Sequence, residues 1–565
     1  MNVAQAIAKI LKREGTEYLF CFPSTPIMDA CAEAGIRPIV VRQERLAGNM
    51  ADGYSRQTNG ERIGVASVQQ SAGAENAFAG VAQAFTDSSP ILMIPGNWPM
   101  TTASLTPNFS SVKNYEHITK WADQIPNAEG MEPRMRRAYT LLRNGRPRPV
   151  VLEVPLDVAA AEIDEPSYTP IRRYLSQADD NEVKKAVDLL LSASHPLIWA
   201  GQGCLYAEAS AELTELAELT GAVVASTLLG KSAINEKHPL ALGAAAFGKN
   251  TMVVRGIEEA DVVFAVGASL ARDFTAAYIP PTDGKGETKK FIHSNIEPED
   301  VNLYFPVESA LIGDAKLVLQ QLIDEVKSRG AEKSRDEVAA VEAVVAQRKA
   351  AWKESWAKHM SSDETPMNFY RVISDFMKTF DPDDVIVSHE SGGTRDMLVP
   401  HYEATVPRSY LGWGHSTQLG FSLGACMGAK LAAPEKLVVN FMGEGAIGMV
   451  LGDLETTVRE RIPIMTVIHN NSGMGNYERN IPKAIELYDN GRLSGDYAGV
   501  AKALGLYAER VEKPEDIIPA YLRAAEAIKN GQSALLDMVT ANQPLISYNG
   551  DDEETLKKSL EKTMY

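Results

Sequence analysis

Two short segments carry residues whose types and places in the chain could do chemistry. Near the N-terminus, Glu44 lies between an apolar stretch and a stretch with a helical pattern. In the last third, Glu444 lies inside a glycine turn, and Asn471 follows an apolar run. A carboxylate and an amide oxygen suit a hard cation such as Mg²⁺ or Ca²⁺, whose shell phosphate oxygens and water can complete. The two segments together suggest a cofactor with a proton-accepting ring at one end and a metal-bound diphosphate at the other.

The elements around the second segment predict that its two polar residues meet. Residues 437–442 and 464–469 are apolar runs typical of buried strands, and residues 453–461 have a helical pattern. A strand, helix and strand in this order predict a parallel crossover. The loops that bear Glu444 and Asn471 then leave neighbouring strands at the sheet edge where open α/β sheets bind ligands. We therefore expect these two side chains to converge on one ion.

The same glycine turn also fits a different motif. Gly443, Gly445 and Gly448 spell the G-x-G-x-x-G fingerprint of dinucleotide-binding proteins after a strand. That fingerprint requires an acidic residue about 20 positions on, at the end of the next strand. Here the next strand ends in His-Asn-Asn, with no acid. The missing acid argues against a dinucleotide, and an ordinary turn without a ligand is the other alternative.

Further motifs follow one another in a characteristic order. They are Arg42-Gln43-Glu44-Arg45, Ala51-Asp52-Gly53-Tyr54-Ser55-Arg56, Gln70-Ser71-Ala72-Gly73-Ala74-Glu75-Asn76, Asp87-Ser88-Ser89-Pro90, Trp199-Ala200-Gly201-Gln202-Gly203, Gly230-Lys231 and Leu419-Gly420-Phe421-Ser422-Leu423-Gly424. With the glycine turn and Asn-Asn pair, their order and spacing resemble the thiamine-diphosphate (ThDP) enzymes. More narrowly, nearly the whole chain resembles the acetolactate synthase and 2-oxo acid decarboxylase family.

The predicted fold class is α/β, with three doubly wound parallel-sheet domains. Composition and the resemblance place a pyrimidine-binding domain at residues 1–165 and a central Rossmann-like domain at residues 181–326. A charged stretch without Gly or Pro, within residues 327–365, predicts a helical linker. The diphosphate- and metal-binding domain is expected at residues 366–545, followed by an exposed tail at residues 546–565.

Glu44 is the predicted catalytic residue. A carboxylate at a strand-to-helix turn is often a solvated helix cap, and position alone leaves that alternative open. The resemblance implies that Glu44 hydrogen-bonds the pyrimidine ring of ThDP and promotes proton loss from the thiazolium carbon, which then attacks a substrate carbonyl. It also implies that Leu419 wedges the two rings of the cofactor into a V. The alternative for Leu419 is an ordinary core leucine.

The resemblance also implies a larger set of residues around the diphosphate. Besides Leu419, the expected cofactor-binding residues are Gly392, Gly393, Thr394, His415, Ser416, Thr417, Gly443, Gly445, Ala446, Asn471, Gly473 and Met474. The expected metal ligands are Glu444, Asn471 and Gly473. A polar turn before an apolar helix favours anion binding at the helix N-terminus, although ordinary capping would use the same residues.

Some positions depart from the family pattern. Glu444 stands where Asp is more common and adds one methylene, to which the strict geometry of Mg²⁺ is sensitive. Ser24 and Thr25 replace a Gly-Gly pair that faces the substrate in relatives, and Gln69 and Gln70 stand where others carry small residues or a catalytic His. Glutamine is no general base at neutral pH but orients carbonyl or carboxylate groups. These four residues form the expected substrate pocket.

Bulk properties exclude several other classes. The chain has 565 residues and a net charge of −18, which argues against nucleic acid or an anionic membrane surface as partner. No apolar run approaches the roughly 20 residues of a membrane span, and the N-terminus lacks the apolar core of a signal peptide. The four cysteines show no C-x-x-C or zinc spacing. Reduced, buried cysteines and a cytoplasmic location are the expectation.

The expected function is a ThDP- and Mg²⁺-dependent lyase or transferase that cleaves the C–C bond next to a carbonyl. A 2-oxo acid such as pyruvate is the expected substrate, with or without joining to a second carbonyl. The alternatives are a 2-hydroxyacyl-CoA or oxalyl-CoA type lyase and a non-catalytic regulatory or scaffolding relative. Family members are homodimers or homotetramers with active sites between subunits. Some relatives bind FAD or ADP in the central domain, but the single G-x-G at Gly201 does not support either here.

Overall fold

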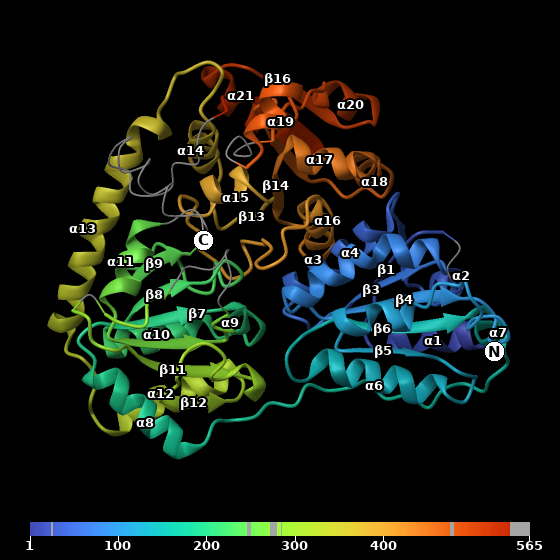
Figure 1. Ribbon diagram of the computed structural model, residues 1–565, viewed down its shortest axis with the longest axis horizontal. Helices are drawn as coiled ribbons and strands as arrows, with labels where there is room; N and C mark the ends of the chain where they lie inside the picture. The colour runs from blue at the N-terminus through green and yellow to red at the C-terminus, as the bar shows by residue number, and fades with distance from the viewer. Residues whose placement is uncertain (24–25, 246–249, 272–278, 284, 475–479, 543–565) are drawn as a thin grey trace.

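Three parallel sheets organise the chain, each with helices packed on its two faces (Figure 1). The computed structural model describes residues 1–23, 26–245, 250–271, 279–283, 285–474 and 480–542. The expected pocket residues Ser24 and Thr25 and the tail at residues 546–565 lie outside the described residues. The α/β class with three doubly wound parallel sheets, expected from the sequence, is confirmed.

The first sheet has the strand order β2-β1-β3-β4-β6-β5. Its strands are β1 (Tyr18–Cys21), β2 (Arg37–Val40), β3 (Gly64–Val68), β4 (Ile91–Asn97), β5 (Trp121–Gln124) and β6 (Val150–Pro155). Its helices are α1 (Val3–Arg13), α2 (Met28–Glu33), α3 (Glu44–Gln57), α4 (Ala72–Thr86), α5 (Ser111–Tyr115), α6 (Met131–Arg143) and α7 (Leu156–Ala160). Successive residues of β1, Leu19 and Phe20, enter separate hydrophobic cores on the two faces, as expected for a doubly covered parallel strand.

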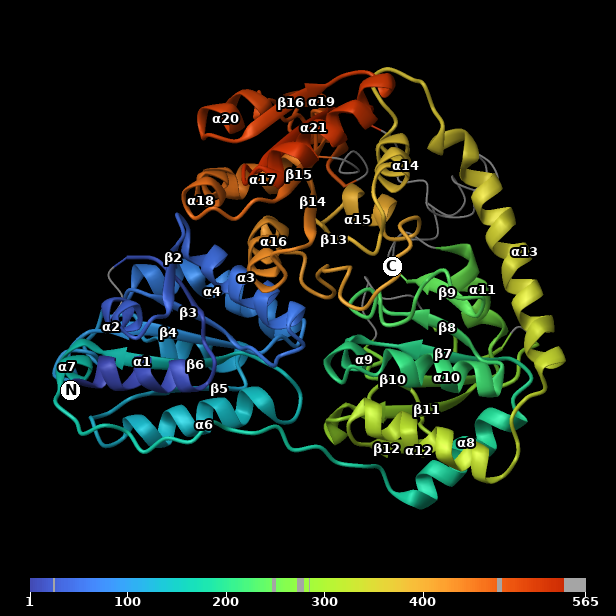
Figure 2. The same cartoon turned by 180° about the vertical axis from the view of Figure 1, so that it is seen from behind.

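The central sheet has the order β12-β11-β10-β7-β8-β9. Its strands are β7 (Pro196–Ala200), β8 (Val223–Ser226), β9 (Ala241–Ala244), β10 (Val262–Val266), β11 (Lys290–Asn295) and β12 (Ser309–Ile312). Its helices are α8 (Asp180–Ser192), α9 (Gln202–Tyr206), α10 (Ser210–Thr220), α11 (Thr251–Glu259) and α12 (Ala315–Ser328). The long α13 (Arg335–Met360) then runs along the outer edge to the third sheet (Figures 1 and 2). It buries Trp352 and Trp356, so one side of this charged helix is part of a core.

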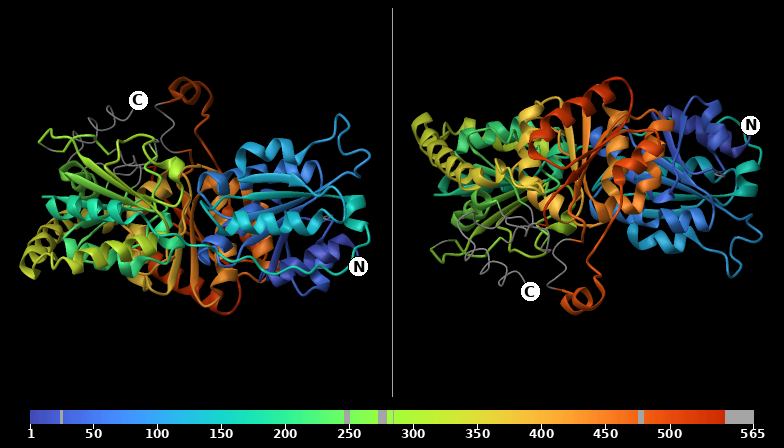
Figure 3. Two further views of the ribbon diagram at one scale, coloured as in Figure 1. Left: turned by 90° about the horizontal axis from the view of Figure 1, so that it is seen from below. Right: turned by 90° about the horizontal axis from the view of Figure 1, so that it is seen from above.

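The third sheet has the order β13-β14-β15-β17-β16. Its strands are β13 (Val385–His389), β14 (Leu437–Gly443), β15 (Met465–Asn470), β16 (Tyr507–Val511) and β17 (Ala534–Val539). Its helices are α14 (Phe369–Thr379), α15 (Gly393–Leu398), α16 (Phe421–Ala432), α17 (Glu444–Val450), α18 (Leu454–Arg459), α19 (Pro482–Tyr488), α20 (Tyr497–Ala503) and α21 (Ile517–Lys529). The helix expected at residues 453–461 is α18, which begins one residue later and ends two residues earlier, and a tight 3₁₀ turn at residues 451–453 joins it to α17. Figure 3 shows α19 projecting from the body, and none of its residues is buried.

Helices α3 and α16 join the first sheet to the third (Figure 2). Their backbones touch because glycines lie at the crossing. A Cβ atom added to Gly53 would come within 2.1 Å of the Ala425 carbonyl oxygen, and one added to Gly428 within 2.1 Å of the Met50 carbonyl oxygen. Close backbone approach of this kind requires glycine, and it fixes the two sheets relative to each other within one chain.

Candidate active site

Glu44 is a buried carboxylate at the start of a helix. It is the first residue of α3 and only 5% exposed, and it accepts a hydrogen bond from the side-chain amide of Asn76 at 3.1 Å. The third sheet steadies the preceding loop, because the Arg42 backbone N–H donates to Asp453 at 2.7 Å. A carboxylate buried to this degree is not a solvated cap, and burying it without a function would be costly.

The loops bearing Glu444 and Asn471 lie next to each other, because they follow the paired strands β14 and β15. One Glu444 oxygen accepts the backbone N–H of Ser472 at 2.5 Å. The Asn471 side-chain oxygen accepts the N–H of Gly473 at 3.2 Å, and Ser472 between them has φ 58°. The structure thus brings Glu444 to the Asn471–Gly473 turn, where the strand pattern predicts a meeting.

The surroundings of Glu444 fit a cation. Burial raises the pKa of Glu444 to about 7, and the nearby Asp537 carboxylate adds to the effect. A positive ion would offset this desolvation and keep Glu444 charged. Within the part of the chain that the structure describes, no three His, Cys, Asp or Glu side chains converge as a metal-binding group. The donors on offer are one carboxylate, an amide oxygen and backbone carbonyls, a set that suits Mg²⁺ when phosphate and water complete the shell.

The remaining residues expected at the diphosphate fall at starts of elements in the third sheet. Gly392, with φ 79°, caps α15, whose first residues are Gly393 and Thr394. Gly443 ends β14, and Gly445 and Ala446 lie in the first turn of α17. The backbone N–H of Met474 donates to the Gly491 carbonyl at 2.7 Å, and Gly473 pairs with Arg492.

Leu419 lies on the segment that leads into α16. Its side chain is half-buried and packs on the core shared by α3 and α16. His415 and Ser416 on the same segment are half-buried, and Thr417 is exposed. Leu419 is therefore not an ordinary, fully buried core leucine, and its place allows contact with a ligand.

The two glutamines lie at the carboxyl end of β3. Gln69 and Gln70 are both half-buried. Gly96 lies between Gln70 and Pro26, since an added Cβ would meet an atom of each at 3.4 Å. The indole N–H of Trp98 donates to the neighbouring Ser71 hydroxyl at 3.2 Å. The end of the first sheet thus presents amides and an indole, which orient polar groups, with no histidine among these side chains.

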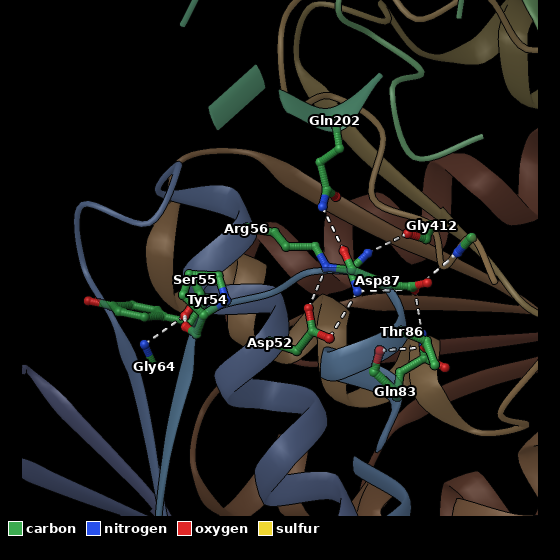
Figure 4. A network of polar contacts seen from close by, with 12 residues as sticks. Asp52, Tyr54, Ser55, Arg56, Gly64, Gln83, Thr86, Asp87, Gln202 and Gly412 are labelled. Atoms are coloured by element: carbon green, nitrogen blue, oxygen red, sulfur yellow. Dashed lines mark hydrogen bonds and ion pairs between the residues drawn. The ribbon is translucent and has the colours of Figure 1, made fainter. Parts of the chain in front are cut away.

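Two buried carboxylates near the site were not singled out by sequence reasoning. Asp87 lies in a polar network with Asp52 and Arg56 (Figure 4). Glu390, at the end of β13, accepts hydrogen bonds from both the N–H and the hydroxyl of Ser422 at 2.7 Å. Asp87 lies in a motif quoted from the sequence, and Glu390 shortly precedes the expected diphosphate residues Gly392 and Gly393, but the partners of both acids come from distant segments. Only Glu390 had a local signal, which is an acid shortly before the glycines that start α15.

Family models match most of the chain in three consecutive pieces. Residues 1–125 match the thiamine pyrophosphate enzyme N-terminal TPP binding domain, residues 183–322 its central domain, and residues 391–538 its C-terminal TPP binding domain. Thiamine pyrophosphate is another name for ThDP. The chain belongs to the ThDP-dependent enzymes. Within them, this ThDP enzyme is of the acetolactate synthase-like decarboxylase and carboligase type.

Curated relatives match along nearly the whole chain. A probable acetolactate synthase large subunit of Methanococcus aeolicus is 28% identical, over 95% of this chain and 92% of its own length. A glyoxylate carboligase of Escherichia coli O157:H7 is 29% identical, over 93% and 90%. A sulfoacetaldehyde acetyltransferase of Alcaligenes xylosoxydans xylosoxydans is 26% identical, over 96% and 94%. These relatives share the family but carry different names for their reactions.

A cavity of about 260 Å³ lies between the first and central sheets, lined among others by Gly203, Gly267, Asp87 and His415. A nucleotide in the central domain would enter here, at the carboxyl ends of β7 and β10. The volume is below the roughly 300–1,000 Å³ of sites for drug-sized ligands, so it adds no support for FAD or ADP.

None of the helices that the structure describes has the length and apolar character of a membrane-spanning segment.

Proposed function

We propose that this ThDP enzyme, with Mg²⁺, decarboxylates a 2-oxo acid and, after loss of CO₂, either releases an aldehyde or joins the carbonyl carbon to a second carbonyl compound. When bound, ThDP supplies the carbon nucleophile and takes up the electrons left by C–C cleavage. The observation that carries the proposal is that one chain of this family has both a buried acid on the first sheet, Glu44, and a loop of oxygen ligands on the third, at Glu444 and Asn471.

The residues of the chain have separate tasks in this proposal. Glu44 holds the proton shared with the pyrimidine ring and so promotes proton loss at the reacting carbon. Glu444, Asn471 and the Gly473 carbonyl bind Mg²⁺, and Leu419 supports the cofactor at its bend. Gln70, at the carboxyl end of β3, orients the substrate carboxylate or carbonyl by hydrogen bonding.

We further infer that the complete site forms between two chains in a homodimer, alone or within a tetramer. Within the described part of one chain, the hydrogen bonds of Glu44 and Glu444 share no residue. Apolar side chains near both are exposed, with Phe78 on α4 at 38% and Met449 on α17 at 46%. Such exposed apolar side chains next to a site fit an interface.

The four cysteines are buried thiols, which supports a reducing compartment such as the cytoplasm.

Calorimetry with ThDP, in the presence and absence of Mg²⁺, tests the cofactor assignment. We expect Mg²⁺-dependent ThDP binding, and CO₂ or aldehyde release when 2-oxo acids, pyruvate and glyoxylate among them, are screened. Absence of ThDP binding would refute the proposal and favour the scaffolding alternative. ThDP binding with turnover of CoA thioesters, and with no reaction of any 2-oxo acid, would instead select the acyl-CoA lyase.

A further inference from the structure

The segment from Gly414 to Ser422 carries Leu419, which the proposed function places against the cofactor, and Ser416 and Thr417, which the family resemblance implies at the diphosphate. Its two ends are held by buried carboxylates. We propose that Asp87 and Glu390 are positioning residues, which fix this segment from two sides and so set the place of the three cofactor-facing side chains. This inference rests on the proposed function, and it concerns residues that do not themselves touch the cofactor.

Asp87 holds the first end of the segment by its backbone. One Asp87 oxygen accepts the N–H of His415 at 2.9 Å, and the other accepts the N–H of Gly414 at 3.0 Å. Asp87 is fully buried. Hydrogen bonds from backbone N–H groups to an ionised acceptor are short and strong, and exclusion of water strengthens them further. Two such bonds to consecutive residues fix the direction in which the chain leaves toward Thr417.

Asp87 is in turn held by groups from separate parts of the molecule. Its second oxygen also accepts from Arg56 at 3.2 Å and from the Gln83 amide at 2.5 Å, and its backbone carbonyl accepts from Gln202 of the central sheet at 2.8 Å. Arg56 donates as well to the Gly412 carbonyl at 2.8 Å. Figure 4 shows Asp87 among Arg56 of α3, Gln202 at the start of α9, and Gly412. The first end of the segment is therefore tied to all three sheets at one point.

Glu390 holds the other end and connects it to a second loop. One oxygen accepts from the N–H and hydroxyl of Ser422, each at 2.7 Å, and the other accepts the N–H of Ser391 at 3.3 Å. The Glu390 carbonyl accepts the Thr394 hydroxyl at 3.1 Å. Glu390 is fully buried, and burial raises its pKa. Because residues 391–394 form the other loop expected at the diphosphate, Glu390 sets the distance between two cofactor-binding loops.

The donor pattern makes a carboxylate specific at position 87. The two oxygens of Asp87 receive four hydrogen bonds from nitrogen donors, three at one oxygen and one at the other. An asparagine must turn its NH₂ toward at least one donor. In the least costly orientation the NH₂ faces the N–H of His415, so the hydrogen bond from His415 to position 87 is lost. We expect Asp87→Asn to leave the fold intact and to loosen this one end of the segment.

Asp52→Asn is a matched control, because Asp52 is also a fully buried carboxylate bonded to Arg56 but no contact with the segment is found for it among the described residues. The first readout is hydrogen exchange of the apo protein in peptides covering residues 412–420. The second is ThDP affinity by calorimetry. Asp87→Asn should speed exchange about 10-fold or more and weaken ThDP binding about 10- to 100-fold, the range typical when a group that orients a ligand is removed. Asp52→Asn should lower thermal stability but leave both readouts within about threefold of wild type.

At Glu390 the comparison is between two substitutions. Glu390→Gln keeps one oxygen for Ser422 and should bind ThDP within about threefold of wild type, whereas Glu390→Ala should weaken binding about 10- to 100-fold. Equal exchange and affinity in Asp87→Asn and Asp52→Asn would overturn the role of Asp87, and equal affinity in the two Glu390 variants would overturn that of Glu390. Hydrogen exchange needs no cofactor, so a wild-type protein that fails to bind ThDP would refute the proposed function while leaving the test of Asp87 intact.

Discussion

At the residue scale, a substitution of Glu44 should affect turnover and ThDP affinity to different degrees. Glu44→Gln keeps the size and the contact with Asn76 but removes the acid, so we expect turnover to fall by about 100-fold or more while ThDP affinity stays within about threefold. Steady-state kinetics and calorimetry measure the two effects. Glu75→Gln, an exposed acid on the neighbouring α4, should change neither. Near-normal turnover in Glu44→Gln would remove Glu44 from the mechanism.

We expect Glu444 to be a metal ligand and to take no part in proton transfer. Glu444→Ala removes the single carboxylate of the proposed shell, so the Mg²⁺ concentration for half-maximal activity should rise about 10- to 100-fold, and ThDP should be lost on desalting. Activity titrations with Mg²⁺ before and after desalting measure this, with the exposed Glu435→Ala as control. Unchanged Mg²⁺ dependence would show that Glu444 is no ligand.

The sequence predicts functional roles for Glu44 and Glu444 because each is a single acid that follows an apolar strand. It also predicts that Glu444 and Asn471 meet, since the crossover rule fixes which loops share a sheet edge. It did not predict the roles of Asp87 and Glu390. Their partners are backbone N–H groups, which every residue carries, and distant segments provide them. Only folding shows which N–H group faces which carboxylate, and the roles of all these residues remain proposals.

At the element scale, the contact of α3 with α16 depends on glycine. Gly53→Ala would drive a methyl group against the Ala425 carbonyl, so the helices must separate. We expect a loss of about 1–3 kcal/mol from this overpacking, more than the gain of up to about 1 kcal/mol from better helix propensity. Thermal unfolding measures the change. Gly448→Ala in α17 should be neutral or stabilising, since the described residues outside its own helix turn place no atom within 4 Å of the added methyl group. Equal effects of the two substitutions would contradict the packing argument.

The contact of α13 with the third sheet should weaken in acid. His401 stacks on Trp352 with ring centres 5.2 Å apart, and burial lowers its pKa to about 3. Its pKa in the unfolded chain is about 6.5, so below that pH the unfolded state takes up a proton that the folded state does not. This stability is present above pH 6.5 and is lost as the pH falls toward 3, by about 2 kcal/mol at pH 5.

His401→Phe keeps an aromatic ring and removes the titrating group. Its melting temperature should therefore fall less than that of wild type between pH 7 and pH 5. His195→Gln, at an exposed histidine, should behave as wild type. Equal falls in wild type and His401→Phe would show that His401 does not drive the acid sensitivity.

Element boundaries followed from the sequence where apolar runs are uninterrupted. The strands expected at residues 437–442 and 464–469 are β14 (Leu437–Gly443) and β15 (Met465–Asn470). The helix expected at residues 453–461 is α18 (Leu454–Arg459), whereas α17 and the 3₁₀ turn before it were not predicted, since glycines interrupt that stretch. The charged residues of α13 predicted a helix, but the sequence did not predict that Trp352 and Trp356 are buried. Only four residues of α13 are buried, so its apolar periodicity is weak.

At the scale of the whole molecule, mixing two inactive variants tests whether the active site lies between two chains. If Glu44 of one chain completes the site at Glu444 of the other, mixed dimers of Glu44→Gln and Glu444→Ala contain one intact site. Unfolding and refolding the two variants together should then restore about a quarter of wild-type activity, since half of randomly formed dimers are mixed and each has one of two sites. Each variant refolded alone is the control. No recovery, with mixed dimers demonstrated, would place both acids in a site within one chain.

The direct backbone contact of α3 with α16 limits how the enzyme can open. Helices that meet carbonyl to glycine have no side-chain layer along which to slide, so the first and third sheets of one chain behave as a single rigid block. Entry of substrate and exit of product must then rely on movements elsewhere, either in loops at the carboxyl edges of the sheets or in the fit between one such block and its neighbour.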